Sequence, residues 1–220
     1  MSVLVIAAHP DDEVLGVGGT IAASVNHANP VDILIVTEGC SSQYPDQPEL
    51  IEVKKKEAKA AANILGARSV HFGGLPDMKL DTIPITEVNR CIEKAVKELK
   101  PNIVFCQARS DVNLDHRIVF DATLVACRPY SAPHVNKLLS YYAPSSSEWG
   151  PDCFDPNWFV DITQTIDEKV EAMRQYRTEV RPSPHPRHPD SLRIAAGYFG
   201  SISGYSFAEP FRLIRARGGI

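Results

Sequence analysis

The residues whose types and spacing point most directly to chemistry form the string HPDDE at residues 9–13, which follows the apolar run Val3–Ala8. An imidazole and a carboxylate three residues apart, such as His9 and Asp12, can both turn toward one ion, and this pair of ligand types suits Zn²⁺. A second carboxylate beside such a pair can act as a general base on the attacking water. The competing interpretation is a solvated turn in which Asp11 or Asp12 caps the following helix.

A second polar cluster, Asp111–His116, follows another apolar run, Asn102–Cys106. A catalytic zinc site usually has three protein ligands and keeps its fourth position open. We expect His116 to lie in the first turn of the next helix, from which its imidazole could reach the same crevice as a third ligand. The competing interpretations are a surface histidine at this position and a helix N-cap role for Asn113, because asparagine is a favoured N-cap.

The elements that must position these clusters alternate between strand and helix along the first 142 residues. β-branched apolar runs predict strands at residues 3–8, 32–37, 69–72, 102–106 and 137–142, and helical periodicity predicts helices at residues 16–26, 47–65, 88–99 and 115–127. Five such rounds favour an α/β fold with a doubly wound, mostly parallel sheet and helices on both faces. Ligands in this architecture bind beyond the carboxyl ends of the strands, where both polar clusters lie.

The pattern changes after Tyr142. Residues 144–158 predict an irregular segment, residues 165–176 a helix, and the proline-rich residues 181–187 a further irregular segment. The tail over residues 190–205 has helical character with a Gly-Ser break at residues 200–204. Because no second core is visible, we expect one domain over residues 1–220, with a sheet core at 1–142 and a C-terminal extension at 143–220 that completes it.

Composition excludes several classes of protein. A net charge of -4 with 44% hydrophobic and 23% charged residues is normal for a soluble globular chain and gives no electrostatic reason to expect nucleic acid or an anionic membrane as a partner. No stretch approaches the ~20 apolar residues of a membrane span, and residues 1–8 do not have the pattern of a signal peptide. Five cysteines without a CxxC pair favour a reduced chain, so we expect a cytoplasmic protein.

The string at residues 8–13, together with Gly16, Gly18 and Gly19, resembles the signature of the PIG-L/LmbE-like family of N-acetylglucosaminyl deacetylases. Weaker similarities run along nearly the whole chain. The resemblance implies a Rossmann-like fold and one zinc ion that serves to remove acetyl groups from N-acetylhexosamine derivatives. By position, His9, Asp12 and His116 resemble the zinc ligands, and Asp11 resembles the general base. A small N-acetylated sugar is the expected substrate, and a homo-oligomer is possible because relatives often assemble.

The chain departs from many members of that family at two positions. Asn113 stands where they have histidine, which changes how an oxyanion would be held, and Lys54 stands where they often have arginine. Lysine lacks the bidentate fork of arginine, which affects substrate contacts. Arg109, Asn113 and His185 are candidate contacts to the oxyanion or to sugar hydroxyls, and each also has an ordinary surface interpretation.

Two other functions compete with hydrolysis. Gly16, Gly18 and Gly19, with Glu38 about 20 residues later, superficially fit a dinucleotide site. Ile21 replaces the third glycine of that motif, however, and the carboxylates at residues 11–13 would repel a pyrophosphate. The second alternative is a metal-binding protein without catalysis, against which the extra carboxylate of Asp11 argues.

Overall fold

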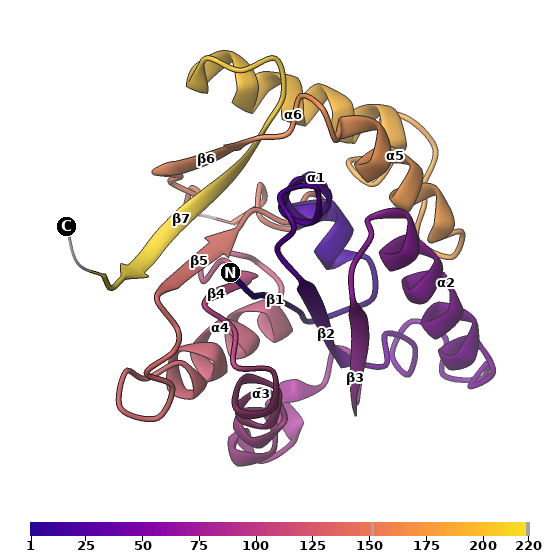
Figure 1. Ribbon diagram of the computed structural model, residues 1–220. Coiled ribbons are helices and arrows are strands. Elements are labelled where there is room, and N and C mark those ends of the chain that lie inside the picture. Colours follow the sequence, from indigo (N-terminus) through magenta and orange to yellow (C-terminus); the bar gives the residue numbers. More distant parts are fainter. Residues whose placement is uncertain (151, 219–220) are drawn as a thin grey trace.

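The computed structural model describes residues 1–150 and 152–218, in which seven strands form one sheet with helices on both faces (Figure 1). The strands are β1 (Val3–Ala7), β2 (Val31–Thr37), β3 (Ser69–Leu75), β4 (Ile103–Gln107), β5 (Lys137–Tyr141), β6 (Trp158–Asp161) and β7 (Ala208–Ala216). The helices are α1 (Asp12–Asn26), α2 (Leu50–Ile64), the 3-10 helix η1 (Leu80–Thr82), α3 (Ile85–Leu99), α4 (Leu114–Ala126), α5 (Ile166–Gln175) and α6 (Pro189–Ser203).

The sheet order is β3-β2-β1-β4-β5-β7-β6. The first five strands of this order are parallel, whereas β7 runs antiparallel to both β5 and β6. One apolar layer joins the sheet to α1, α2 and α5, and a second joins the opposite face to α3 and α4. The predicted doubly wound, mostly parallel α/β fold with helices on both faces is therefore confirmed.

The predicted elements differ from the structure mainly after residue 142. The sequence pattern did not predict β6 and β7, and the predicted break inside the last helix is wrong, because α6 runs uninterrupted to Ser203. Gly204 then ends α6 in a left-handed conformation with φ 84°, and the chain turns back into β7. The part of the sheet beyond β5 is thus built from C-terminal residues.

Helix α1 begins at Asp12, not at Gly16 as predicted, so the glycines lie inside the helix and are buried. A Cβ atom on Gly16 would overlap the ring of Tyr141, and one on Gly19 would lie 2.8 Å from the side chain of Ile162. Glycine is therefore required here because the helix packs directly against its neighbours. The dinucleotide interpretation needs these glycines in a loop at the strand's tip, and their place in α1 rules it out.

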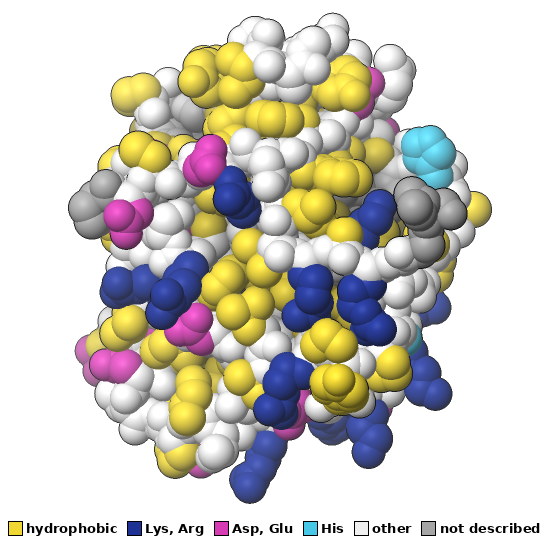
Figure 2. All heavy atoms as spheres, turned by 90° about the vertical axis from the view of Figure 1, so that its left-hand side faces the viewer, with side chains coloured by type: hydrophobic (Ala, Val, Ile, Leu, Met, Phe, Trp, Pro, Cys, Tyr) yellow, Lys and Arg dark blue, Asp and Glu magenta, His cyan; other side chains and the backbone are white. Residues whose placement is uncertain are grey.

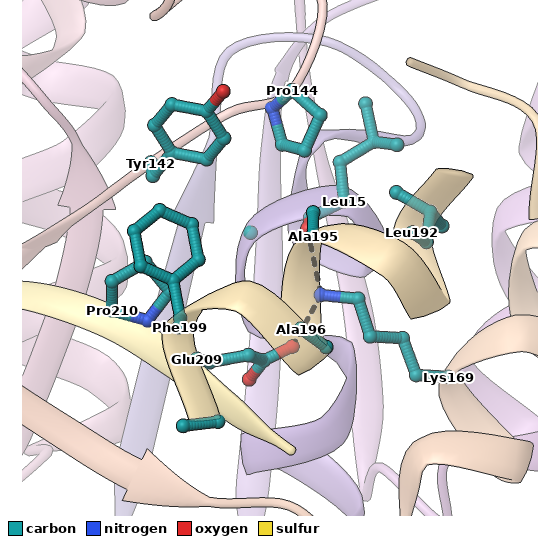
Figure 3. Close-up of a pocket in the computed structure, with 12 residues that line it drawn as sticks. Leu15, Tyr142, Pro144, Lys169, Leu192, Ala195, Ala196, Phe199, Glu209 and Pro210 are labelled. Atoms are coloured by element: carbon teal, nitrogen blue, oxygen red, sulfur yellow. Dashed lines mark hydrogen bonds and ion pairs between the residues drawn. The ribbon is translucent and has the colours of Figure 1, made fainter. Parts of the chain in front are cut away.

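A buried ion pair between α5 and β7 also forms hydrogen bonds to the backbone of α1 (Figure 3). Lys169 Nζ of α5 lies 2.5 Å from Glu209 Oε1 of β7 and donates to the Leu15 carbonyl of α1 at 2.8 Å. Glu209 also accepts the backbone amides of Gly19 at 3.0 Å and Thr20 at 2.8 Å. A cavity of ≈ 20 Å³ beside this pair is otherwise lined largely by apolar side chains.

The outer face of α6 carries exposed apolar side chains. Figure 2 shows them gathered toward the top of the molecule, where α6 lies in Figure 1. Ile194, Tyr198 and Ile202 of α6 are 73%, 61% and 54% exposed. Among the described residues, no helix is long and apolar enough to cross a membrane.

Candidate metal centre and active site

The topology places both polar clusters at one edge of the sheet. β1 and β4 are adjacent parallel strands, although about 100 residues separate them in the chain. The residues after β1 and those after β4 therefore emerge side by side, at the point where the strand order reverses direction. Such a switch point is where open α/β sheets bind ligands.

The structure brings together the three predicted metal ligands at this point. His9 Nδ1 lies 3.1 Å from His116 Nε2, and Asp12 Oδ2 lies 3.3 Å from each of these nitrogens. Zinc bonds of about 2.0–2.2 Å in a tetrahedral arrangement put neighbouring ligand atoms about 3.3–3.6 Å apart. The three donor atoms thus match one face of a coordination tetrahedron in both chemical type and spacing, and they fit a zinc ion.

Carboxylates orient both imidazoles. His116 Nδ1 lies 3.0 Å from Asp111 Oδ2, and His9 Nε2 lies 3.3 Å from Asp115 Oδ2, so each ring directs its other nitrogen toward the shared centre. Such carboxylate partners fix the tautomer and orientation of metal-binding histidines. Burial opposes charge on both rings, but the carboxylates outweigh it and raise the pKa of His9 to about 10 and that of His116 to about 9. The surroundings therefore stabilise positive charge at the centre.

Asp12 is held as an anion. Its Oδ2 accepts the backbone amide of His9 at 2.8 Å and Nε2 of Gln107 at 3.0 Å. Burial alone would raise the pKa of this carboxyl, yet the adjacent His116 and His9 outweigh burial and keep the pKa well below its usual range. A permanently ionised carboxylate is the form that binds a metal ion.

Asp11 has a different environment, although it is the next residue. Its backbone is left-handed with φ 115°, and its side chain is 1% exposed. Oδ2 has no hydrogen-bond partner among the described residues and lies 3.5 Å from Nη1 of Arg187. Burial raises the pKa of this carboxyl well above its usual value, and Arg187 opposes that rise. Asp11 is thus a buried carboxylate next to Asp12 in the sequence, with Arg187 as its charged neighbour and no hydrogen bond to Oδ2 from the described residues.

Glu13 stabilises the left-handed backbone conformation of Asp11 through a hydrogen bond. One carboxylate oxygen accepts the Asp11 amide at 3.3 Å, and the other accepts the hydroxyl of Tyr176, which is buried at the end of α5. Burial raises the pKa of Glu13 to about 7. The C-terminal extension therefore touches the residue that fixes the backbone of Asp11.

A chain of alternating charges leads away from Asp11. Arg187 Nη1 lies 2.7 Å from Glu179 Oε2, and Glu179 Oε1 lies 2.5 Å from Lys54 Nζ. Lys54 also donates to the carbonyl of Gly39 and is 2% exposed. Lys54 is one of the residues that line a pocket beside His9 and Asp11, where its charge is paired with that of Glu179, and its contact with substrate stays a prediction. Arg187 and Glu179 were missed as site residues because their partners are distant in sequence and Arg187 lies in an irregular proline-rich segment.

The other predicted contacts have different outcomes. Asn113 caps α4, since its Oδ1 accepts the amides of Asp115 and His116, and it also lines the pocket beside the metal face. Arg109 lies outside this pocket, because its side chain is 70% exposed and pairs with Asp121 at 3.2 Å. His185 also lies outside the residues that line the pocket, and its Nδ1 accepts the Arg187 amide at 3.1 Å. The structure thus supports a place in the pocket for Asn113 only, among these three.

Comparison with known proteins gives consistent similarities. Residues 4–127 match PIG-L, described as GlcNAc-PI de-N-acetylase. The chain is 28% identical to diacetylchitobiose deacetylase of Thermococcus kodakarensis, over 96% of this chain and 82% of that protein. It is 29% identical to a probable N-acetyl-alpha-D-glucosaminyl L-malate deacetylase 2 of Bacillus anthracis, over 80% of each chain. A conserved protein of Thermus thermophilus has a similar solved structure, with a TM-score of 0.80, 27% identity, and coverage of 99% of this chain and 96% of that one.

Proposed function

This chain belongs to the PIG-L family of de-N-acetylases, and we propose that it is a zinc-dependent enzyme that hydrolyses the N-acetyl group of an N-acetylated sugar or sugar conjugate. The products would be acetate and a free amine. One observation carries the proposal: three donor atoms match a face of a zinc tetrahedron, and the buried carboxylate of Asp11 lines the same pocket as His9.

We assign zinc to His9, Asp12 and His116 because two imidazoles and one carboxylate suit this ion better than Mg²⁺ or Ca²⁺, which prefer oxygen ligands. Zinc, when bound, would polarise the acetyl carbonyl and lower the pKa of the attacking water. Asp111 and Asp115 would keep the imidazoles in the orientation that binds the ion. The similarity to relatives named as deacetylases supports the removal of an acetyl group as the reaction.

The chain's own side chains would then move the protons. Asp11 takes a proton from the attacking water and returns it to the amine, which otherwise would be a poor leaving group. Arg187 faces Asp11 at 3.5 Å and would stabilise the negative charge that Asp11 carries before the first transfer and after the second. Asn113 lines the pocket, and its Nδ2 contacts only Met78 Sδ while its Oδ1 caps α4, which supports the proposal that this amide donates to the developing oxyanion.

The alternative is a metal-binding protein on the same scaffold without catalysis. A purely structural zinc site is closed by four protein ligands, whereas the described residues offer three at this centre. A structural zinc site also has no need of an additional carboxylate such as that of Asp11, which is not one of the three ligands. The predicted homo-oligomer and the predicted cytoplasmic location stay predictions.

The deciding experiment measures acetate release from N-acetylglucosamine and N,N′-diacetylchitobiose by zinc-loaded and chelated protein. The test variant is Asp11→Asn, which keeps the shape of the side chain and removes the proton acceptor. We expect one zinc per chain and a fall in turnover of roughly 10²–10⁴. Asp121→Asn makes the same chemical change on the exposed face of α4 and is the matched control. Normal turnover by the zinc-loaded Asp11→Asn protein would exclude the role of base, and zinc without any acetate release would favour the alternative.

A further inference from the structure

Tyr176 follows the last residue of α5 and is fully buried, although it lies 163 residues beyond Glu13 in the chain. Its hydroxyl donates to Oε1 of Glu13, whose side chain is also buried. The other oxygen of that carboxylate, Oε2, accepts the backbone amide of Asp11 at 3.3 Å. One carboxylate therefore joins the C-terminal extension to the backbone of the residue that we propose as the general base.

The backbone of Asp11 needs such support from its surroundings. Its φ of 115° is unfavourable for a residue that has a Cβ atom. A conformation of this kind persists only where the surrounding structure fixes it. The carbonyl of Asp11 is held by the amides of Val14 at 3.0 Å and Leu15 at 2.9 Å, which begin α1. The amide of Asp11 is held by Glu13.

This conformation lets two consecutive carboxylates face different partners. Asp12 Oδ2 lies 3.3 Å from His116 Nε2 in the metal face, whereas Asp11 Oδ2 lies 3.5 Å from Arg187 Nη1. Relaxation of Asp11 to an ordinary backbone conformation would turn its carboxylate in another direction. A general base acts only within hydrogen-bonding reach of the proton it takes, so a displacement of about 1 Å is costly.

The backbone of Tyr176 contributes to the same region by a separate route. Its carbonyl accepts the amide of Glu179 at 3.0 Å, and Glu179 Oε2 lies 2.7 Å from Arg187 Nη1. The hydroxyl of Tyr176 thus reaches the backbone of Asp11 through Glu13, while its carbonyl begins the turn that leads to Arg187. A substitution that removes only the hydroxyl separates the first route from the second.

We infer that Tyr176 is a positioning residue: through Glu13, its hydroxyl holds Asp11 in the backbone conformation from which the carboxylate acts as a base. The inference rests on the proposed function and adds to it a residue that does not line the pocket. The ring of Tyr176 fills space in the core, but among the described residues its hydroxyl bonds only to Glu13. The hydroxyl therefore serves the geometry of Asp11.

The first test measures this geometry without any reaction. Tyr176→Phe keeps the ring and removes the donor, and exchange of the Asp11 amide with deuterium is followed by NMR of the zinc-loaded protein. Relative to the Ile33 amide in β2, we expect this exchange to quicken by at least about tenfold. Tyr141→Phe is the matched control, because it removes an equally buried hydroxyl that donates to the Ile6 carbonyl at 3.0 Å, and it should leave the ratio within about twofold. An unchanged ratio in folded Tyr176→Phe overturns the inference.

The second test measures acetate release by the same variants. We expect Tyr176→Phe to bind one zinc per chain and to lose about 10–100-fold in kcat with KM within about twofold, because only the base is displaced. Tyr141→Phe should lower Tm but keep kcat within about threefold. A kcat within about threefold of the wild type in zinc-loaded Tyr176→Phe would contradict the positioning role. If the wild type releases no acetate, the proposed function fails, whereas faster exchange in the first test would still show that Tyr176 holds Asp11.

A third comparison asks whether the effect passes through Glu13, and it also serves if Tyr176→Phe does not fold. Glu13→Gln and Glu13→Met both remove the negative charge at similar length. Glutamine keeps an oxygen for the Asp11 amide and an NH2 group that can donate to the Tyr176 hydroxyl oxygen, whereas methionine keeps neither. We expect kcat of zinc-loaded Glu13→Gln to exceed that of Glu13→Met by at least about tenfold. Equal values in the two folded, zinc-loaded proteins would refute the role of these hydrogen bonds.

Discussion

Asn113 has two groups with different uses, and substitutions can separate them. Its Oδ1 accepts the backbone amides of Asp115 at 2.9 Å and His116 at 3.4 Å, which begins α4. Its Nδ2 lies 3.3 Å from Met78 Sδ, and a thioether sulfur is only a weak acceptor. The amide donor is therefore almost unused by the protein and is available to a substrate oxyanion. We predict that Asn113→Ala affects both stability and turnover, whereas Asn113→Ser affects turnover only.

The magnitudes follow from these contacts. Loss of an N-cap costs about 1 kcal/mol, which in a chain of this size corresponds to a fall of about 2–4 °C in Tm. Loss of one oxyanion donor costs about 10²–10³ in kcat. Asn113→Ala should show both effects. Asn113→Ser retains an oxygen that can cap α4 but has no amide donor, so its Tm should stay near that of the wild type while kcat falls by the same 10²–10³.

The assay combines three measurements on each variant: Tm, zinc content, and acetate release per folded, zinc-loaded molecule. Zinc content is needed because His116 lies in the first turn of α4 and frayed caps could weaken its hold on the ion. If Asn113→Ser releases acetate at a rate within about fivefold of the wild type, then Asn113 is a helix cap and the oxyanion assignment is wrong. If both variants lose zinc, the effect on turnover belongs to the metal centre instead.

Three further changes test a metal ligand, the packing of α1 and the ion pair between Arg68 and Asp32. His116→Ala should remove most of the bound zinc with the fold retained, measured by elemental analysis and circular dichroism, and stoichiometric zinc would contradict its assignment as a ligand. Gly16→Ala should destabilise the protein by about 1–3 kcal/mol, read as a lower Tm, because the new methyl group would overlap the buried ring of Tyr141. Burial opposes ionisation of Asp32, but the hydrogen bonds from Arg68 and Ser69 outweigh burial and lower the pKa of this carboxyl. The ionised Asp32 therefore stabilises the folded protein at pH values above the ordinary pKa of aspartate, and this contribution is lost as the pH falls through the lowered pKa. Arg68→Ala should therefore be less stable than the wild type by about 1 kcal/mol at pH 7, the difference should vanish in acid, and urea titrations at several pH values that show a constant difference would refute the account.

The meeting of His9, Asp12 and His116 could be predicted from the sequence because each of the two segments that carry them has a recognisable local pattern. His9 and Asp12 lie in one turn, and His116 follows a strand that the alternating pattern identifies. Parallel strands carry their carboxyl ends to one edge, so the two clusters could be expected to meet without any knowledge of the strand order. The spacing of the apolar residues was sufficient to predict the strands that precede residues 9–13 and residues 111–116.

The charge network around the centre could not be predicted in the same way. Glu179 and Arg187 meet Asp11 and Lys54 only through tertiary packing, and nothing in the order of residues 176–188 indicates that contact. Arg109 is a predicted contact to the oxyanion or to sugar hydroxyls, yet its side chain pairs with Asp121 on α4. Charged side chains have long, flexible stems, so sequence position constrains their direction less than it does for a histidine at the start of a helix.

Strand β7 escaped prediction for a related reason. Its sequence, AEPFRLIRA, contains a proline and no regular alternation, which argues against a strand in the interior of a sheet. It nevertheless lies between β5 and β6, with Pro210 opposite Phe159. The short β6 supplies a partner that no local pattern reveals.

The ion pair between Lys169 and Glu209 has a consequence for how the protein matures on the ribosome. Helix α1 contains three glycines, which form helices poorly by themselves, and its backbone is bonded to a side chain that is synthesised almost 190 residues later. Residues 9–13 therefore leave the exit tunnel long before the elements that hold them in place. Until β7 has been made and joined to β5, the nascent chain exposes an unfinished sheet edge and a weak first helix. Synthesis and docking of β7, not growth of the parallel core, should be the moment at which residues 9–13 acquire their final geometry.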